Sequence, residues 1–381
     1  MQYFSSSFRL GILGGGQLGK MLLYETRKWD VNTKVLDPSA DAPCRISCNE
    51  FVQGDLLDYQ TVLDFGKGLD LLTIEIENVN IEALKTLKNQ GVKVYPEPEA
   101  LEIISNKSKQ KDFYCEKGIP TAAHQNFSSK EGLLEAQLSY PCVWKSAEFG
   151  YDGKGVSVLR DAEDLKALPD TPCLIEEKIA FKKELAVIVA RNENGEMTTY
   201  PVVGMDFHPT ANQVEYVVCP AAIDDVIANE ARQIAVKVAE NLKITGLLAV
   251  ELFLDQDDRI LVNEVAPRPH NSGHYSIEAS YTNQFEQHLR AILGLPLGST
   301  DSKAIGIMVN LVGAEGFEGP VLYENIEQVM KLKGVTVHIY GKSETRPFRK
   351  MGHVTIVDQD RESAYEKAKK VKEILIIKSN G

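Results

Sequence analysis

The sequence predicts an α/β N-terminal domain, an α+β central domain and a small C-terminal domain. The first hundred residues alternate short apolar runs with helical patterns, which is typical of a parallel sheet with crossover helices. From residue 121 to about 297, β-rich stretches surround one strong helix, which indicates an α+β unit and not a second βαβ array. The last eighty residues add a few strands and a charged helix.

The N-terminal domain is predicted over residues 1–105 from this alternation. Strands are expected at residues 8–13, 33–36, 69–74 and 92–95, and helices at 18–29, 59–65 and 81–89. The pattern breaks at Pro96 and Pro98, and a polar, lysine-rich helix is expected next, at 106–117. The first domain boundary therefore falls at residue 105.

The central domain is predicted over residues 106–300 and the C-terminal domain over residues 301–381. Central strands are expected at 142–145, 156–159, 173–177, 185–190, 214–219, 247–254 and 260–265. The central helix, 227–242, carries its apolar residues on a single face, as a helix packed against a sheet does. In the C-terminal domain, strands at 305–311, 335–340 and 353–357 precede a helix at 361–374.

Composition excludes several classes of protein. The 381 residues include 54 acidic and 42 basic ones, a net charge of −12 that disfavours general nucleic-acid binding. No run of about 18 apolar residues could span a bilayer. The start MQYFSSSFRL lacks the basic and apolar regions of a secretory signal. We therefore expect a cytoplasmic protein that binds neither nucleic acid nor membranes.

The six cysteines are scattered, and only Cys44 and Cys48 lie close together in the sequence. The chain has no CxxC pair and no accompanying histidine cluster. This spacing predicts buried thiols that behave as small apolar groups, not a zinc site or a disulfide framework.

A glycine-rich loop, GGGQLG at residues 14–19, follows the first expected strand and opens the first expected helix. With Asp37 at the end of the next strand, it satisfies the dinucleotide-binding pattern. It also resembles a P-loop through Lys20, but Met21 stands where a hydroxyl is required. Glycines allow close approach of the backbone, and a helix N-terminus favours an anion. A bound anion, a dinucleotide and a tight structural turn all remain open.

A second glycine-rich segment, FGYDGKG at residues 149–155, joins two expected strands of the central domain. Lys145 precedes it and Lys154 lies within it. A loop with many backbone donors and flanking lysines suits closure over a polyphosphate. An ordinary hairpin turn with solvated lysines is the alternative.

Two glutamates lie inside apolar strands that the turn 255–258 joins as an antiparallel hairpin. Glu251 stands in AVELFL and Glu264 in LVNEVA, with Asn263 beside it. Buried carboxylates need a partner, and Mg²⁺ is a natural one because it takes few protein oxygens together with phosphate oxygens. Pairing with lysines or exposure to solvent is the alternative. The hairpin predicts a metal site.

Polar side chains crowd the stretch after this hairpin. APRPHNSGH at residues 266–274 carries Arg268, His270, Asn271 and His274. Irregular loops of this kind hold substrate groups. A second basic cluster at 346–353 contains Arg346 and Lys350 and could gather an anionic group, although charge runs are more often solvated surface.

Taken together, these motifs resemble the ATP-grasp enzymes, and within them the 5-(carboxyamino)imidazole ribonucleotide synthase family of purine biosynthesis. The similarity runs from LGILGGGQLGKM through Glu75 to Asn78, YDGKG and NEVAPRPHNSGH to RPFRKMGH, over essentially the whole chain. The chain departs from the family pattern at Phe149, at Phe348 within the usual R-P-G-R-K run, and at Ala180, where Asp or Asn is common before the residue corresponding to Phe181.

The resemblance implies an ATP-grasp fold with a Rossmann-like preATP-grasp domain at residues 1–105 that binds aminoimidazole ribonucleotide. Residues 106–180 would form a mobile lobe, residues 181–300 the metal and substrate lobe, and residues 301–381 the C-terminal domain. The implied ATP-binding residues are Lys107, Lys145, Gly150, Tyr151, Asp152, Gly153, Lys154, Gly155, Val156, Glu176, Glu177, Lys178, Ile179, Glu184, His208, Asn263 and Glu264. Glu251 and Glu264 would hold Mg²⁺, with Mn²⁺ as an alternative.

The resemblance also implies a substrate site. Its residues would be Gly16, Gln17, Leu18, Glu77, Asn78, Tyr151, Arg268, His274, Arg346 and Lys350. Arg268, His270, Asn271, Tyr151 and Asp152 would act in catalysis, with His270 or His274 handling the proton. The implied reaction is ATP- and bicarbonate-dependent carboxylation of the exocyclic amine, through carboxyphosphate, to give the carbamate, ADP and phosphate.

The resemblance implies partners, and the motifs leave rival functions open. The resemblance implies a homodimer and a hand-over of the product to the carboxyaminoimidazole ribonucleotide mutase. Rival functions are another ATP-grasp enzyme, such as a formate-dependent transformylase or a biotin carboxylase, an NAD-dependent oxidoreductase that uses Asp37, and a non-catalytic nucleotide sensor. The oxidoreductase leaves YDGKG and the glutamate hairpin unexplained.

Overall fold

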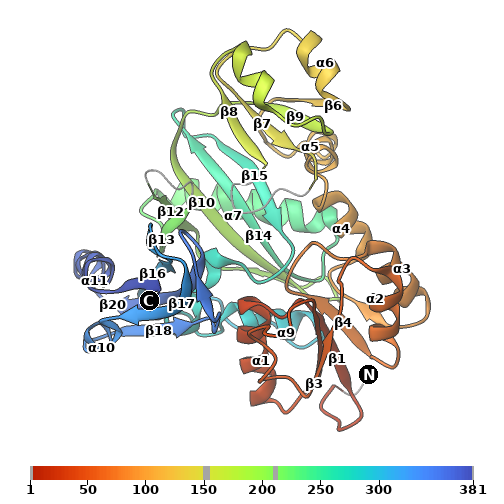
Figure 1. The fold of residues 1–381 in the computed structure, drawn as a ribbon, viewed down its shortest axis with the longest axis vertical. Helices are drawn as coiled ribbons and strands as arrows, with labels where there is room; N and C mark the ends of the chain where they lie inside the picture. Colours follow the sequence, from red (N-terminus) through yellow and green to blue (C-terminus); the bar gives the residue numbers. More distant parts are fainter. Residues whose placement is uncertain (1–2, 149–154, 209–212, 380–381) are drawn as a thin grey trace.

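The computed structural model describes residues 3–148, 155–208 and 213–379. Figure 1 shows an elongated molecule with the N-terminal domain at one end, a small four-stranded lobe at the other, and a large sheet between them. The C-terminal segment, drawn in blue, lies on the left of this view. In the described part of the chain, no helix is long and apolar enough to cross a membrane.

The N-terminal domain is built on a five-stranded parallel sheet in the order β3-β2-β1-β4-β5. Its strands are β1 (Arg9–Leu13), β2 (Asn32–Asp37), β3 (Glu50–Gln53), β4 (Leu71–Ile74) and β5 (Lys93–Val94). Helix α1 (Gln17–Lys28) covers one face, and α2 (Tyr59–Gly66) and α3 (Ile81–Asn89) cover the other. Side-chain caps fix two of these helices, because Asp58 accepts from Thr61 N–H and Asn80 from Ala83 N–H. The predicted α/β architecture is confirmed.

Two helices lead out of this domain. The sequence predicts a break at Pro96 and Pro98, but α4 (Pro98–Ile104) begins there because proline suits the first position of a helix. Helix α5 (Lys107–Glu116) follows, with Asn106 as its cap. It leads into the small lobe, an antiparallel sheet in the order β6-β9-β7-β8. The lobe contains β6 (His124–Phe127), α6 (Lys130–Glu135), β7 (Cys142–Ser146), β8 (Val156–Leu159), the 3-10 helix η1 (Ala162–Ala167) and β9 (Cys173–Glu177).

The large sheet has nine antiparallel strands in the order β15-β14-β10-β12-β13-β16-β20-β18, with β11 paired to β10. Its central strands are β10 (Phe181–Arg191), β11 (Met197–Thr199), β12 (Val203–Phe207), β13 (Val214–Cys219), β14 (Gly246–Asp255) and β15 (Ile260–Ala266). Helix α7 (Asp225–Leu242) buries its predicted apolar face against β10 and β14. The short helices η2 (Asn271–Gly273), α8 (Ser276–Ala279) and α9 (Gln284–Ile292) follow β15.

Three C-terminal strands extend this sheet, and three others form a small sheet of their own in the order β19-β17-β21. Strand β16 (Ile305–Val312) pairs with β13 and continues to β20 (Lys350–Asp358) and β18 (Val335–Ile339). Helix α11 (Arg361–Ile374), which has the predicted bounds, packs on β16 and β20. The remaining elements are β17 (Gly319–Glu324), α10 (Ile326–Val329), β19 (Glu344–Thr345) and β21 (Ile376–Ser379). The boundary at residue 301 stays a prediction.

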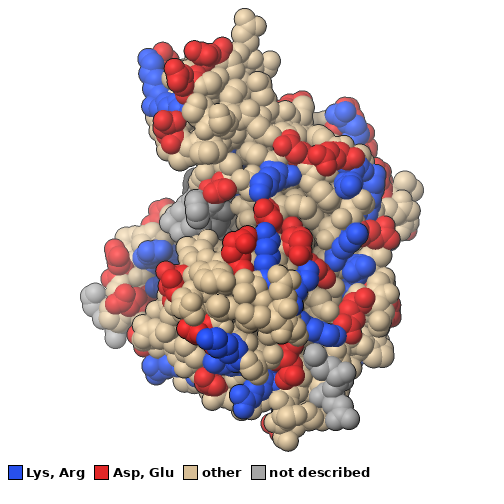
Figure 2. Space-filling model, turned by 90° about the vertical axis from the view of Figure 1, so that its right-hand side faces the viewer, with Lys and Arg blue, Asp and Glu red and all other residues tan. Residues whose placement is uncertain are grey.

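The cysteines and the surface charges can now be located in this fold. All six cysteines are free thiols, and four of them are buried, as expected for small apolar groups. Figure 2 shows acidic and basic side chains interspersed over one face of the molecule, with a notch between the small lobe and the body.

Candidate active site

The glycine-rich loop between β1 and α1 is held by two carboxylates of the protein itself. Gly15 N–H donates to Asp37 Oδ2 at 2.7 Å, so Asp37 fixes the turn where a dinucleotide site would use it for ribose. Gly16 N–H and Gly19 N–H donate to the two oxygens of Glu75 at 2.8 and 3.0 Å. Part of the anion-binding capacity of this helix end is thus used internally.

Two amides of the same turn are left for a ligand. In the described part of the chain, no residue accepts a hydrogen bond from Gln17 N–H or Leu18 N–H. One turn further, Lys20 Nζ donates to the carbonyls of Ile339 and Tyr340 at 3.1 and 3.3 Å. The C-terminal domain therefore lies against the start of α1.

The basic segment of the C-terminal domain continues from this contact. Lys342 Nζ donates to the carbonyl of Lys350 at 2.7 Å, and Lys350 begins β20. Arg346 is exposed between β19 and β20. Lys350 also lies close enough to Glu251 to lower the pKa of that carboxyl, against the larger effect of burial. The segment thus lies between the glycine-rich loop and the glutamate hairpin.

The predicted glutamate hairpin is present. Glu251 in β14 lies opposite Glu264 in β15, and Ala186 of β10 lies opposite Glu251 from the other side. Glu184 is two residues before Ala186, so all three carboxylates lie on one face of the sheet. A β-bulge follows, since Leu252 pairs with Val262 and leaves Asn263 as the extra residue. The bulge lets both Asn263 and Glu264 reach lysines of the small lobe and α5.

Lysines from two other elements meet this face. Lys107, the first residue of α5, forms an ion pair with Glu264. Lys145 of β7 donates to Asn263 Oδ1 at 3.0 Å and pairs with Glu176 Oε2 at 2.9 Å. The other oxygen of Glu176 pairs with Lys111 at 3.2 Å. Lys111 is 2% exposed, and sequence reasoning missed it.

The carboxylates have very different proton affinities. Burial, reinforced by Glu264 and Glu184, raises the pKa of Glu251 to about 8, whereas the ammonium of Lys107 lowers the pKa of Glu264 to about 2. Burial and then Glu264 raise the pKa of Glu184 to about 7. Carboxylates that share one face in this way favour a positive charge beside them.

The donor set fits Mg²⁺ held mainly by phosphate. Among the described residues, no group of three or more His, Cys, Asp or Glu side chains is arranged to hold a metal ion. Two carboxylates on facing strands suit an ion that takes one or two protein carboxylates and completes its shell with waters and substrate phosphates. Glu251 and Glu264 would be its ligands.

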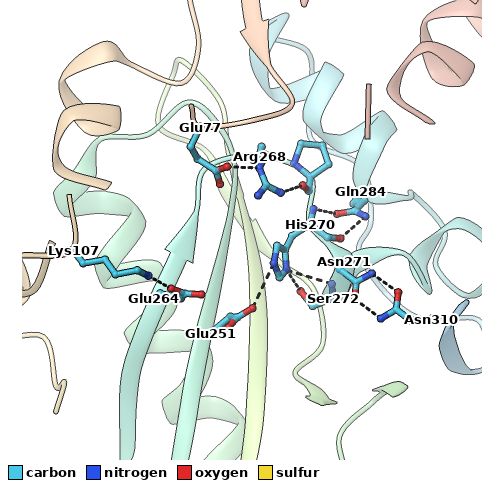
Figure 3. Close-up of polar contacts among 11 residues, drawn as sticks. Glu77, Lys107, Glu251, Glu264, Arg268, His270, Asn271, Ser272, Gln284 and Asn310 are labelled. Carbon is cyan, nitrogen blue, oxygen red and sulfur yellow. Dashed lines mark hydrogen bonds and ion pairs between the residues drawn. The ribbon is translucent and has the colours of Figure 1, made fainter. Parts of the chain in front are cut away.

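The loop after β15 brings a histidine to this face, as Figure 3 shows. His270 Nε2 lies 3.5 Å from Glu251 Oε1, and His270 Nδ1 contacts Ser272 Oγ at 2.9 Å. Arg268 Nε pairs with Glu77 Oε2 of the N-terminal domain at 2.9 Å. The loop therefore joins the glutamate hairpin to the domain that carries the glycine-rich turn.

Comparisons with known proteins agree with this fold. Three family models match in order, the ribonucleotide synthetase preATP-grasp domain at residues 8–105, the ATP-grasp domain at 112–285 and the phosphoribosylaminoimidazole carboxylase C-terminal domain at 306–367. The chain is 38% identical to N5-carboxyaminoimidazole ribonucleotide synthase of Bacillus subtilis over 92% of this chain and 91% of that protein. The chain belongs to the N5-carboxyaminoimidazole ribonucleotide synthase family.

Solved structures of this synthase family have the same fold. The synthetase of Thermotoga maritima is 41% identical, with a TM-score of 0.90 over 98% of this chain and all of that one. The Aspergillus clavatus synthase, solved with ADP and 5-aminoimidazole ribonucleotide, is 32% identical, with a TM-score of 0.87 over 96% of this chain and 98% of that one. Phosphoribosylaminoimidazole carboxylase of Saccharomyces cerevisiae is 36% identical over 91% of this chain but only 63% of that longer protein. The expected ATP-grasp fold is confirmed.

The predicted site residues are brought together only in part. Asn271 turns toward Asn310 of β16, and the two carboxamides exchange hydrogen bonds of 2.9 and 3.0 Å. His274 is 1% exposed and stacks on His353 with ring centroids 4.7 Å apart, so the protein covers its ring. Its predicted contact with substrate stays a prediction.

Several predicted ATP residues lie at the edge of the small lobe. Glu177 ends β9, and Lys178 and Ile179 connect it to β10. Gly155 has φ +76° and precedes Val156. Val156 of β8 pairs with Lys145 of β7. Residues Gly150, Tyr151, Asp152, Gly153 and Lys154 lie outside the described residues, as does Phe149.

Two further positions complete the comparison with the sequence. His208 contacts the ring of Phe348 edge to face, with centroids 6.0 Å apart, and Phe348 has φ +61°, a conformation that favours the glycine usual in the family. Asn78 is exposed in the connection between β4 and α3, next to Glu77. Neither observation identifies a ligand, so the assignments of His208 and Asn78 stay predictions.

Proposed function

We propose that this chain carboxylates the exocyclic amine of 5-aminoimidazole ribonucleotide with ATP and bicarbonate. The observation that carries the proposal is the arrangement of Glu251, Glu264 and His270 on one face, next to Lys107 and Lys145. Relatives of the same family support the substrate, since the Aspergillus clavatus synthase was solved with ADP and this ribonucleotide. The chain is then an ATP-dependent carbon–nitrogen ligase of purine biosynthesis.

Phosphoryl transfer is the first step. An oxygen of bicarbonate attacks the γ-phosphorus of ATP, the bond to ADP breaks, and carboxyphosphate forms. Lys107 and Lys145 neutralise charge on the transferring group, because catalysis of this step consists of positioning and electrostatic stabilisation. Mg²⁺ or Mn²⁺ held by Glu251 and Glu264 would supply further positive charge. Carboxyphosphate is short-lived in water, so the segment 150–156 would exclude solvent.

Carbon–nitrogen bond formation follows. The exocyclic amine attacks the carbonyl carbon of carboxyphosphate, or CO₂ released from it, and phosphate leaves. One proton must leave the amine nitrogen. His270 is the candidate acceptor because its Nε2 is directed at the reacting face, and Arg268 and Asn271 orient the substrate.

The ribonucleotide would bind between the N-terminal and C-terminal domains. The amides of Gln17 and Leu18 would hold its phosphate together with Arg346 and Lys350, since a helix N-terminus and basic side chains both favour an anion. Glu77, paired with Arg268, would lie toward the imidazole. We further propose a cytoplasmic homodimer that hands its product to the carboxyaminoimidazole ribonucleotide mutase.

Release of ADP tests the proposal. Purified protein is given MgATP and bicarbonate with and without 5-aminoimidazole ribonucleotide, beside a Glu264→Ala variant. We expect strong stimulation by the ribonucleotide in the wild type and its loss in the variant. Absence of stimulation would refute the substrate assignment and direct the search to other ATP-grasp acceptors.

A further inference from the structure

The carboxamide of Gln284 forms three hydrogen bonds inside the protein. Gln284 is the first residue of α9 and is fully buried. Its Oε1 accepts from His270 N–H at 2.9 Å, and its Nε2 donates to His270 O at 2.8 Å and contacts His274 Nδ1 at 2.9 Å. The side chain therefore binds both main-chain polar groups of His270, as Figure 3 shows.

These contacts fix the residue that is directed at Glu251. With its main chain held by Gln284 and its Nδ1 held by Ser272, His270 presents Nε2 to Glu251 Oε1. His270 lies between β15 and η2 and not within a strand, so no ladder of backbone hydrogen bonds sets its position. The carboxamide of Gln284 takes the place of such a ladder.

The surrounding sequence makes room for this carboxamide. A methyl group at Gly273 would come within 2.4 Å of Gln284 Oε1, so a larger residue would push the carboxamide away. Ser276 Oγ accepts from Gln284 N–H at 3.0 Å and itself donates to Gly273 O. The start of α9 and the turn of the loop are thus locked together.

The other face of α9 packs against the N-terminal domain. Phe285, Leu289 and Ile292 share one core with Leu18 and Leu22 of α1. Helix α1 is the helix whose first amides would hold the ribonucleotide phosphate. A single short helix therefore contacts the loop that bears His270 on one side and the substrate-binding helix on the other.

We propose that Gln284 is a positioning residue that sets the His270 imidazole against Glu251 and keeps it in register with α1. The inference rests on the proposed function and adds a residue to its machinery. Misplacement of a group by about 1 Å can cost roughly 100-fold in rate, so loss of this carboxamide should lower turnover without touching the nucleotide.

The chain offers a matched control on the same helix. Gln287 is also fully buried, and its carboxamide also binds a main-chain N–H and C=O, those of Gly298, both at 2.9 Å. Gln284→Met and Gln287→Met remove the same chemical group. The first takes the acceptor from His270 N–H, while His270 O still accepts from Gly273 N–H, and the second takes the acceptor from Gly298 N–H. Only the first removes support from His270.

The experiment measures kcat, KM for ATP and the ADP released per carbamate formed, at a temperature below the unfolding midpoint of every variant. We expect Gln284→Met to lower kcat roughly 100-fold with KM for ATP within about twofold, and Gln287→Met to stay within about twofold in both. Gln284→Glu turns a carboxylate oxygen toward His270 O in place of the Nε2 donor, so it should lower kcat at least as far as Gln284→Met. ADP release should exceed carbamate formation in the Gln284 variants alone.

Each other outcome overturns the inference. Equal kinetics of Gln284→Met and Gln287→Met would overturn it. A failure of both Gln284 variants to fold, while Gln287→Met folds, would also overturn it, because the role of Gln284 would then be structural only. If the wild type itself shows no ribonucleotide-dependent ADP release, the proposed function has failed, and the inference falls with it.

Discussion

The free energy of unfolding should depend on pH because of His288, which lies at the contact between the N-terminal and central domains. It is fully buried on α9, where Nδ1 accepts from Leu247 N–H at 3.3 Å and Nε2 then donates to Thr73 Oγ1 at 2.9 Å. A methyl group at Gly246 would come within 2.9 Å of the ring, so no water fits on that side. Burial lowers the pKa of His288 to about 3.

The sign and size of the effect follow from these groups. The unfolded chain binds a proton near pH 6.5 and the folded one only near pH 3, so protons favour unfolding between these values. Stability is therefore highest above about pH 7 and is lost as the pH falls. Integrated from pH 7 to pH 5, the loss is about 2 kcal/mol in the free energy of unfolding.

Urea unfolding of the wild type and of His288→Gln at pH 7 and pH 5 measures this contribution. The carboxylates and the other buried histidines titrate in both proteins, so the difference between them isolates His288. We expect the wild type to lose about 2 kcal/mol more than the variant over this range. Equal losses would contradict the low pKa of His288, because they would mean that His288 takes up a proton in the folded protein without cost.

Three further predictions address the site and its supports. Glu264→Gln should lower ADP release at least roughly 100-fold while circular dichroism stays unchanged, because the side chain keeps its size but loses the charge that we propose to bind Mg²⁺; retention of activity would contradict the assignment. Glu75→Ala should lower the free energy of unfolding by about 1–3 kcal/mol, since the amides of Gly16 and Gly19 lose their acceptor, and urea unfolding measures it; an unchanged midpoint would show that water replaces the carboxylate. Phe348→Gly should raise the unfolding midpoint, because a left-handed backbone costs a non-glycine residue about 1–2 kcal/mol; a lower midpoint would mean that the contact with His208 outweighs this strain.

Much of the fold follows from local patterns. Helix α11 has the predicted bounds, and α7 and four of the five strands of the parallel sheet lie where apolar spacing places them. Strand β3 was missed. Pro98 was misread as a break because the same residue that ends one helix can begin another. Continuity of the C-terminal strands with the large sheet depends on the pairing of β13 with β16, which spacing along the chain does not encode.

The candidate site was predictable where carboxylates interrupt apolar strands. Glu251 and Glu264 stand out for that reason, and the hairpin turn places them opposite each other. Lys111 and Gln284 were missed because a lysine in a lysine-rich helix and a glutamine at a helix start both read as exposed, although both are buried. Asp37 was open to a cofactor role until the structure showed its carboxylate on Gly15 N–H.

Transfer of oxygen from bicarbonate to phosphate tests whether ATP activates bicarbonate at this site. With MgATP, 5-aminoimidazole ribonucleotide and ¹⁸O-labelled bicarbonate, attack on the γ-phosphorus transfers one bicarbonate oxygen to each phosphate released. We expect singly labelled phosphate to form in step with ADP and carbamate. Phosphate free of label, with carbamate still produced, would contradict activation of bicarbonate by ATP at Glu251 and Glu264.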